Sequence, residues 1–396
     1  MLFLGVIYAI CVGLLLYSYL FYPLIIRIAS SFYARNQIVF QSADEFPFLS
    51  VLIAAYNEEK VIEAKIESVV ASMQASGMTK LAIRVGSDHS SDSTNAILAR
   101  MAEKYPFVLP VYFKERLGKP SIINSLAQMA IEQHGDHVLM ITDANVMFSK
   151  STIFQLLKHY KGPKIAVVES NIISTGLSEK GISHSEKTYV SGEIDLKYGE
   201  GQIFGVFSGP MGGCFCIRST FYKPVPAHFL VDDFYLAMAA IEQGGKAIVE
   251  PNSVCYEAIS HEISAEIKRK ARIGTGNFQN LLRFRALWMR FPFTGISIVL
   301  FSHKIIRWLG PLLLIFALFS LIPLALNNAF FLLLLCGHLG LMFVVPLLYL
   351  LLEKLNIHWS RLRLITYFFA ANYALLIGFF RFAVGRQNGI WEPTKR

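Results

Sequence analysis

The stretch His137-Val-Leu-Met-Ile-Thr142 is the clearest central strand of the sequence, because it is apolar almost throughout and stops at Asp143. A short apolar run that ends at a turn residue is typical of a strand buried on both faces. Three similar runs precede it, and helical patterns separate the four. The runs cover residues 49–55, 81–85 and 111–113, and the helical patterns cover residues 59–75, 91–104 and 121–133. This alternation predicts an α/β fold with a mainly parallel, Rossmann-like sheet.

Ligands bind beyond the carboxyl ends of the strands in such a sheet. This rule selects four short segments as places for chemistry. They are Tyr56-Asn57-Glu58, Gly86-Ser87-Asp88, residues 116–119 and Asp143-Ala144-Asn145.

Two of these segments suit a phosphate-bearing ligand and a cation. Asp143 and Asn145 offer side-chain oxygens two residues apart, and Mg²⁺ binds through one or two carboxylates together with substrate phosphates. The same residue types also favour an ordinary strand-end turn. Lys119 follows Gly118 directly before a predicted helix, whose N-terminus attracts phosphate. Asp88 could accept a hydrogen bond from a nucleotide base.

Further downstream, Asp232 and Asp233 begin another helical stretch, where the helix dipole favours acidic residues and one of them could serve as a general base. Gly212 and Gly213 could allow the backbone to approach a ligand closely. A basic helical run, residues 266–272, could clamp a diphosphate through arginine or contact lipid headgroups.

The composition indicates a membrane protein. Hydrophobic residues make up 54% of the 396 residues and charged residues 16%, and the mean hydropathy is +0.46, which argues against a purely soluble protein. Five cysteines are too few for a disulfide-dense secreted scaffold. The net charge, 37 − 28 = +9, raises nucleic acid as a partner. However, the basic residues cluster at membrane edges and no nucleic-acid reader motif occurs, so we expect no nucleic-acid partner.

Residues 2–26 carry no charge and are long enough to cross a bilayer. Phe21-Tyr22-Pro23 lies where a cleavable signal peptide would need small residues, so a retained anchor is expected. Arg27 and Arg35 follow, which predicts a cytoplasmic side for the next segment. The apolar block 308–352 is divided near Asn327-Asn328, and residues 364–380 form a last apolar segment.

These segments predict five parts: an anchor at 1–27, a cytoplasmic domain at 28–276, an interfacial amphipathic segment at 277–307, about three transmembrane helices at 308–385, and a tail at 386–396. Span parity puts the C-terminus outside the cell, whereas the basic residues after the last span favour the inside. This conflict stays open.

The order and spacing of the polar segments resemble family 2 glycosyltransferases, and the resemblance covers residues 50–276. The matching motifs are Ala55-Tyr-Asn-Glu58, Ser87-Asp-His-Ser-Ser-Asp-Ser-Thr94, Gly118-Lys119 with Asn124, Thr142-Asp-Ala-Asn145, residues 209–213, Val231-Asp-Asp233 and Arg269-Lys-Ala-Arg272. Family members are inverting enzymes with a GT-A fold. The membrane-bound branch includes chitin-oligomer, hyaluronan and exopolysaccharide synthases.

The resemblance implies a role for each matching residue. Asn57, Glu58 and Asp88 would bind the nucleoside, and Lys119 the phosphates. Arg272 would match the arginine of the family's Q-x-x-R-W signature, and the further expected substrate-binding residues are Tyr56, Gly212, Gly213 and Arg269. Asp143 and Asn145 would bind the metal, Mg²⁺ or Mn²⁺. Asp233 would be the general base, with Asp232 beside it.

The sequence departs from the family pattern in three ways. Ser87 replaces the first acid of the usual D-D-x-S pair, and Asn145 replaces the second acid of D-x-D. Arg269 and Ile273 replace the glutamine and tryptophan of the Q-x-x-R-W signature, which is linked to polymer synthesis. The third departure argues against long-chain synthesis more than against sugar transfer.

The resemblance implies a hexosyl- or N-acetylhexosaminyltransferase in a bacterial inner membrane, with its catalytic domain in the cytoplasm. The expected donor is a nucleotide-diphospho-sugar, with UDP as the first expectation, and the acceptor a lipid-linked or polysaccharide sugar. Two alternatives remain: a processive synthase that makes and translocates a polysaccharide, and a catalytically silent membrane subunit that binds nucleotide-sugar or partners. The oligomeric state is not predicted.

Overall fold

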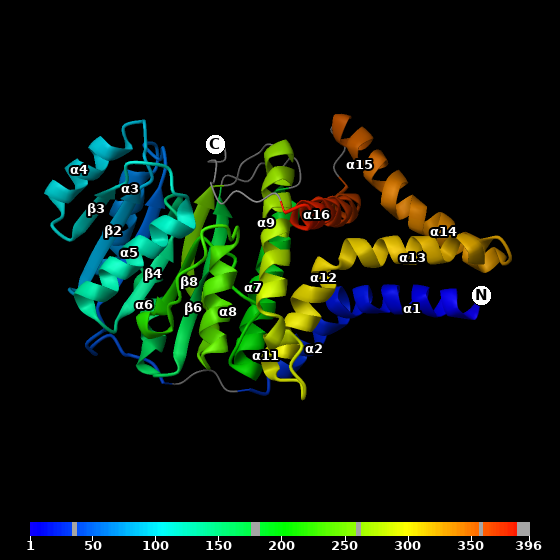
Figure 1. Ribbon diagram of the computed structural model, residues 1–396, viewed down its shortest axis with the longest axis horizontal. Helices are drawn as coiled ribbons and strands as arrows, with labels where there is room; N and C mark the ends of the chain where they lie inside the picture. Colours follow the sequence, from blue (N-terminus) through cyan, green and yellow to red (C-terminus); the bar gives the residue numbers. More distant parts are fainter. Residues whose placement is uncertain (34–37, 176–182, 259–262, 356–358, 386–396) are drawn as a thin grey trace. The chain divides into compact units, whose positions relative to one another are not determined.

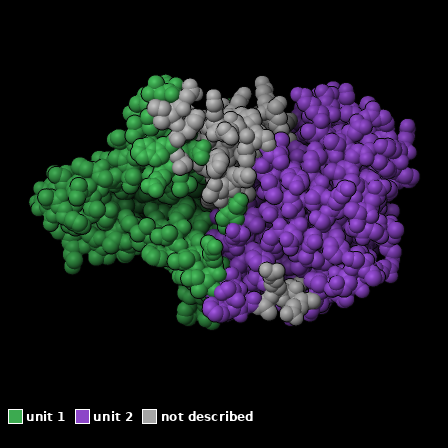
Figure 2. All heavy atoms as spheres, turned by 180° about the vertical axis from the view of Figure 1, so that it is seen from behind, with its two compact units in different colours: residues 1–28, 177–192, 260–386 green, residues 29–176, 193–259, 387–396 purple. Residues whose placement is uncertain are grey.

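The computed structural model describes residues 1–33, 38–175, 183–258, 263–355 and 359–385. The chain divides into two compact units (Figure 2). Unit 1 comprises residues 1–28, 177–192 and 260–386, and unit 2 comprises residues 29–176, 193–259 and 387–396. The predicted tail, residues 386–396, and Arg35 lie outside the described residues.

Unit 2 is built on one eight-stranded sheet with the order β3-β2-β1-β4-β7-β6-β8-β5 (Figure 1). The strands are β1 (Leu49–Ala55), β2 (Leu81–Ser87), β3 (Val108–Tyr112), β4 (Val138–Thr142), β5 (Val146–Phe148), β6 (Ile165–Thr175), β7 (Cys214–Arg218) and β8 (Lys246–Ala258). The first four strands pair in parallel, as predicted. Strand β7 runs antiparallel to both β4 and β6, and β5 runs antiparallel to β8, so the complete sheet is mixed.

Helices cover the sheet of unit 2 on two faces. They are α3 (Ile62–Ala75), α4 (Thr94–Lys104), α5 (Lys119–His134), α6 (Thr152–Leu157), α7 (Ser183–Phe204, shared with unit 1) and α8 (Asp232–Glu242), with short helical turns at Lys158–Lys161 and Ser219–Phe221. Apolar residues of α3, α4 and α6 share one core cluster with Val138 and Met140 of β4. Leu139 and Ile141 are equally buried but lie outside this cluster, as alternation along a strand requires.

The opposite face holds α5 and α8. At Gly86 of β2 an added Cβ would lie 2.4 Å from the Ile122 side chain, so only glycine lets α5 lie this close to the strand. This close packing puts the first residue of α5, Lys119, at the carboxyl edge of the parallel strands.

Unit 1 is helical. Its elements are α1 (Leu2–Leu16), η1 (Tyr17–Phe21), α2 (Tyr22–Ser30), α9 (Ile263–Arg283), α10 (Arg285–Trp288), α11 (Gly295–Val299), η4 (Leu300–Ile305), α12 (Ile306–Trp308), α13 (Gly310–Ala325), α14 (Ala329–Leu339), η5 (Gly340–Val344), α15 (Val345–Lys354) and α16 (Ser360–Ala383). Helix α1 packs on α13, and α9 packs on α16.

Three helices in the described residues are long and apolar enough to cross a membrane: Leu2–Ser30, Ala329–Leu352 and Arg361–Ala383. A fourth crossing results if Gly295–Trp308 and Gly310–Ala325, which meet at a bend of 61°, form one span. Between α13 and α14 the Asn328 side chain accepts a hydrogen bond from the Phe330 N–H and caps the new helix. The chain therefore turns at the Asn327-Asn328 pair.

Polar contacts join distant segments within unit 1. Ser18 donates a 2.6 Å hydrogen bond to the Ser302 carbonyl, and Arg307 donates to the Ser18 carbonyl. Gly274 of α9 and Gly378 of α16 allow these helices to approach closely, because a Cβ at Gly378 would lie 2.8 Å from the Gly274 backbone. Close contact through small residues is a common way for helices to associate in a bilayer.

Candidate active site

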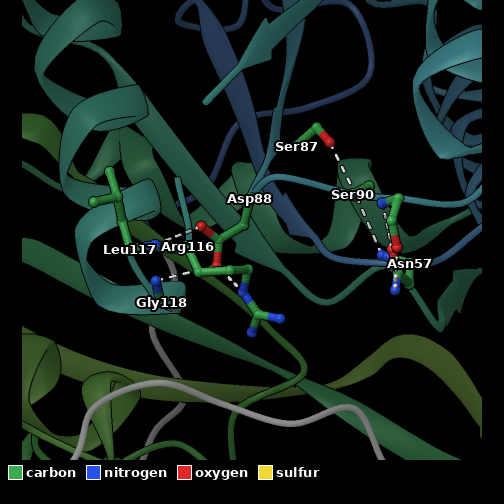
Figure 3. A network of polar contacts seen from close by, with 8 residues as sticks. Asn57, Ser87, Asp88, Ser90, Arg116, Leu117 and Gly118 are labelled. Carbon is green, nitrogen blue, oxygen red and sulfur yellow. Dashed lines mark hydrogen bonds and ion pairs between the residues drawn. The ribbon is translucent and has the colours of Figure 1, made fainter. Parts of the chain in front are cut away.

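Asp88, which directly follows β2, organises the loop before α5 (Figure 3). One carboxylate oxygen accepts a 2.7 Å hydrogen bond from the Leu117 N–H, and the other accepts from the Gly118 N–H and from Arg116 Nε. The side chain is almost fully buried. Because Lys119 follows this loop, Asp88 sets the position of Lys119 as well as being a candidate for contact with a base.

The ends of β1 and β2 meet beside this loop. Asn57 has a φ of +53°, a left-handed conformation that asparagine tolerates. Its N–H donates to Ser90 Oγ (Figure 3), and its Oδ1 accepts from the Ser91 N–H. The Arg116 guanidinium lies 3.2 Å from the centre of the Tyr56 ring, which is a cation–π contact. These contacts join two of the segments that the sequence selects.

Lys119 connects the loop before α5 with two acidic segments. Its Nζ lies 2.7 Å from Asp143 Oδ1 and 3.8 Å from Asp232 Oδ2. Burial alone would lower the pKa of Lys119, but the charges of Asp143, Asp232 and Asp233 and the hydrogen bond to Asp143 outweigh it and raise this pKa above its ordinary value. Lys119 is therefore a fixed positive charge among carboxylates.

Asp232 and Asp233 begin α8 and are both buried. Asp233 Oδ1 accepts a 2.7 Å hydrogen bond from the Phe234 N–H. Burial and then the charge of Asp232 raise the pKa of Asp233 to about 7, although Lys119 and the Phe234 N–H oppose the shift. A carboxyl group with such a pKa can accept and release a proton near neutral pH.

The glycine turn before β7 lies against both acidic segments. Gly212 and Gly213 have φ values of +83° and +65°, where glycine is favoured. A Cβ at Gly212 would lie 2.9 Å from Asp233 Oδ2. The Gly213 carbonyl accepts hydrogen bonds of 2.9 Å from the Asp143 N–H and from Thr142 Oγ1. The turn thus links Asp143 to Asp233.

A buried ion pair supports this turn. Lys197 of α7 binds both carboxylate oxygens of Glu169 at 2.6 Å, and neither side chain has appreciable exposure. Glu169 Oε1 also accepts a 2.7 Å hydrogen bond from the Met211 N–H. No local sequence pattern predicts this pair, because it joins two segments whose proximity only the fold defines.

Lys65, which lies beneath the Asp143 segment, was also not predicted from the sequence. It is fully buried in α3, and its Nζ donates to Thr142 Oγ1 at 2.9 Å and to the Val146 carbonyl. The ammonium lies 3.7 Å from the centre of the Phe148 ring. Burial lowers the pKa of Lys65 to about 8. Lys65 thus holds both ends of the segment that carries Asp143 and Asn145. The position of a lysine on the apolar side of α3 is the sequence signal that could have identified it.

We expect Lys65→Met to loosen this segment. The substitution leaves the Val146 carbonyl without its donor, so we expect a loss of about 2 kcal/mol in the free energy of unfolding. Thermal melting of the purified full-length protein measures the effect. Lys80→Met removes an exposed lysine and is the matched control, with a change below about 0.5 kcal/mol. Equal melting temperatures of the Lys65 variant and wild type would refute the role of Lys65 in holding the segment that carries Asp143 and Asn145.

The residues present fit a divalent cation of the Mg²⁺ or Mn²⁺ type. No cluster of three or more His, Cys, Asp or Glu side chains that could hold a metal occurs in the part of the chain that the structure describes. However, a cation bound to a diphosphate needs only one or two protein oxygens. Asp143 is partly exposed, and the Asn145 Oδ1 accepts no hydrogen bond from the described residues. This pair supplies suitable hard ligands.

The structure joins most of the predicted site residues in unit 2. The connected residues are Tyr56, Asn57, Asp88, Lys119, Asp143, Gly212, Gly213, Asp232 and Asp233. Asn145 follows Asp143 in the same turn, and the Glu58 N–H donates a hydrogen bond to Thr94 Oγ1.

Arg269 and Arg272 belong to α9 of unit 1, so the geometry of unit 2 does not include them. Asn124, from the same motif as Lys119, binds the Val225 carbonyl and the Tyr222 hydroxyl and has a structural role.

Residues 50–224 match the protein family Glycosyl transferase family 2. Poly-beta-1,6-N-acetyl-D-glucosamine synthase of Staphylococcus aureus is 26% identical over 165 residues, which is 38% of either chain. The probable glycosyltransferase YdaM of Bacillus subtilis is 34% identical over 120 residues, 30% of this chain and 27% of that protein. The chain thus spans well under half the length of these curated relatives.

A solved structure extends the similarity to the whole fold. The mannosyltransferase PcManGT of Pyrobaculum calidifontis, in complex with GDP-Man and Mn²⁺, has a TM-score of 0.70 at 17% identity. The similarity covers 96% of this chain and 99% of that chain. At this identity the likeness establishes the fold, which is GT-A, and not the substrate. Residues 50–224 are thus similar in sequence to Glycosyl transferase family 2, and the chain shares the GT-A fold.

Proposed function

We propose that this protein is an inverting glycosyltransferase that moves a sugar from a nucleotide-diphospho-sugar to a lipid-linked or polysaccharide acceptor at a membrane. One observation carries the proposal: Lys119 joins Asp143 and Asp232 at the carboxyl edge of the sheet, next to Asp233 with its raised pKa. A lysine that can bind a diphosphate therefore lies next to a carboxyl group that can accept a proton, as sugar transfer from a diphosphate requires.

In the proposed reaction Asp233 accepts the proton of the acceptor hydroxyl. The hydroxyl oxygen bonds to the anomeric carbon as the bond from that carbon to the diphosphate breaks, and the diphosphate leaves with the electron pair. Lys119 stabilises the charge that develops on the leaving group. Asp143 and Asn145 would hold Mg²⁺ or Mn²⁺, which when bound supplies further positive charge to the diphosphate. Arg272 and Arg269 of α9 are proposed as additional phosphate ligands.

The donor class rests on the relatives. The synthases from Staphylococcus aureus are named for an N-acetylglucosamine polymer, and PcManGT is a mannosyltransferase. We propose a UDP-sugar as the first donor to test and a GDP-sugar as the second. The apolar helices of unit 1 favour an acceptor that resides at a membrane.

A processive synthase is the second candidate function, favoured by the polymer in the relatives' name. Arg269 and Ile273 replace the glutamine and tryptophan of the Q-x-x-R-W signature. This replacement favours the transfer of few sugars over the synthesis of a long polymer. A catalytically silent subunit is less favoured, because Asp143, Lys119 and Asp233 are retained in mutual proximity.

Membranes containing the protein, incubated with a panel of labelled nucleotide-sugars, test the proposal. We expect label from one donor in a lipid-extractable or polymeric product. One added sugar supports single transfer, and a ladder of lengths supports the processive alternative. Absence of any product with the whole panel, while the protein still binds a nucleotide-sugar, would favour the silent subunit.

We further propose that unit 2 lies in the cytoplasm of a bacterial cell, with unit 1 in the inner membrane. Arg27 lies in the last turn of the first apolar helix, and basic residues accumulate on the cytoplasmic side. A reporter inserted within residues 103–110 should give a cytoplasmic signal. A periplasmic signal would separate the site from nucleotide-sugars and contradict the proposal.

A further inference from the structure

Asn145 is bound to an acidic residue that lies 112 positions later in the chain. Its Nδ2 donates a 2.9 Å hydrogen bond to Oε1 of Glu257. The sheet fixes this contact, because β5 pairs antiparallel with β8 and sets Val146 opposite Glu257. Asn145 is only 7% exposed and Glu257 is half-buried, so the pair is built into the fold rather than formed by two mobile surface groups.

This contact determines which way the Asn145 amide faces. The reverse orientation would put the amide oxygen against the Glu257 carboxylate, where two acceptors would repel each other. With Nδ2 on Glu257, the amide oxygen is directed away from that carboxylate and accepts no hydrogen bond from the described residues. This oxygen is not fully buried. Because no described residue donates a hydrogen bond to it, it is open to a ligand two residues from Asp143.

We propose that Asn145 and Glu257 together form the second arm of the divalent-cation site. In this arm the Asn145 oxygen contacts the cation, and Glu257 orients the amide and supplies the negative charge. The inference rests on the proposed function, in which Asp143 binds the same cation. Groups that orient a metal ligand commonly change metal affinity by about 10- to 100-fold when they are removed.

The pair also gives a physical reason for asparagine at a position where the family pattern has aspartate. A carboxylate at residue 145 would face the Glu257 carboxylate at hydrogen-bond distance. Two carboxylates that share a site cannot both ionise easily. One amide and one carboxylate avoid this cost and retain one negative charge beside Asp143. Asn145 and Glu257 are thus a matched set.

A swap of the two groups provides the sharpest test. Glu257→Gln removes the charge but keeps an acceptor oxygen for the Asn145 amide, so the fold should be retained. Asn145→Asp combined with Glu257→Gln moves the carboxylate to residue 145, and the hydrogen bond then runs from residue 257 to residue 145. Glu132→Gln, which removes an exposed charge from α5, is the matched control.

The measurement is Mn²⁺ binding to the purified full-length protein, followed by electron paramagnetic resonance with UDP or GDP present in parallel samples. We expect Glu257→Gln to weaken Mn²⁺ binding by about 10-fold or more, with melting unchanged. The double variant should recover most of this loss, and Glu132→Gln should bind as wild type does.

Unchanged Mn²⁺ affinity in Glu257→Gln, or no recovery in the double variant, would overturn the inference. Asp143→Ala separates this result from a failure of the proposed function. If Asp143→Ala loses Mn²⁺ and Glu257→Gln does not, the cation site stands and only its second arm is refuted. If wild type and Asp143→Ala bind Mn²⁺ equally weakly, the cation site itself is refuted.

Discussion

Asp233→Asn should lower turnover by about 100-fold or more and leave donor binding nearly unchanged. The amide has almost the shape of the carboxyl group and can still accept the Phe234 N–H, but it cannot take a proton from the acceptor. The loss should therefore appear in the rate constant for transfer and not in the affinity for nucleotide-sugar. Steady-state kinetics combined with equilibrium binding of the donor separate the two.

The pH dependence gives a second readout of the same residue. A general base works only when it is ionised, and the pKa of Asp233 is raised to about 7. Wild-type kcat/KM should therefore be full above this value and fall as the pH drops through it, and Asp233→Asn should lack this dependence. Asp232→Asn is the control and should cost less. If only Asp232→Asn lost turnover, the assignment of the base would be off by one residue.

Asp143→Ala should abolish transfer and weaken binding of the nucleoside diphosphate. The substitution removes a proposed cation ligand and also the nearest partner of Lys119, whose Nζ lies 2.7 Å away. Lys119 would then retain the weaker contact with Asp232. Turnover and Mn²⁺-dependent nucleotide binding measure the two effects.

Asp195→Ala, an exposed acid of α7, should leave both quantities unchanged and serves as the control. Transfer by Asp143→Ala at the wild-type rate would contradict a role for Asp143. Full turnover of wild type in EDTA would contradict the metal specifically, while leaving Lys119 as the group that neutralises the diphosphate.

The parallel half of the sheet could be predicted because each strand is a continuous apolar run that ends at a polar turn. Strands β1, β2 and β4 lie within two residues of their predicted limits. Strand β3 was predicted at residues 111–113 and covers Val108–Tyr112, since its first residues include Pro110 and carry little pattern.

The other half of the sheet, which contains β5 to β8, could not be predicted from local sequence patterns. Strands β6 and β8 mix buried and exposed residues along 11 and 13 positions, and β5 has three residues, so neither length nor periodicity marks them. The antiparallel insertion of β7 between β4 and β6 depends on tertiary packing. A local pattern cannot specify it.

The candidate site likewise contains residues that the local sequence predicts and residues whose roles depend on tertiary contacts. Asp88, Lys119 and Asp143 follow or precede apolar elements directly, and the rule that ligands bind at the carboxyl edge brings them together. Lys65 and Glu257 could not be assigned, because their roles depend on contacts 77 and 112 residues away in the chain. The structure also shows a further role for Asp88, whose carboxylate accepts hydrogen bonds from residues 116–118 and fixes their position.

The configuration of the transferred sugar tests the central proposal most directly. Direct attack on the anomeric carbon, with Asp233 as base, inverts that carbon. A product made by the wild-type protein from an α-linked nucleotide-sugar should therefore show a β linkage in the coupling constant of its anomeric proton, measured by nuclear magnetic resonance. An α-linked product would require retention of configuration and would contradict the mechanism proposed for this site.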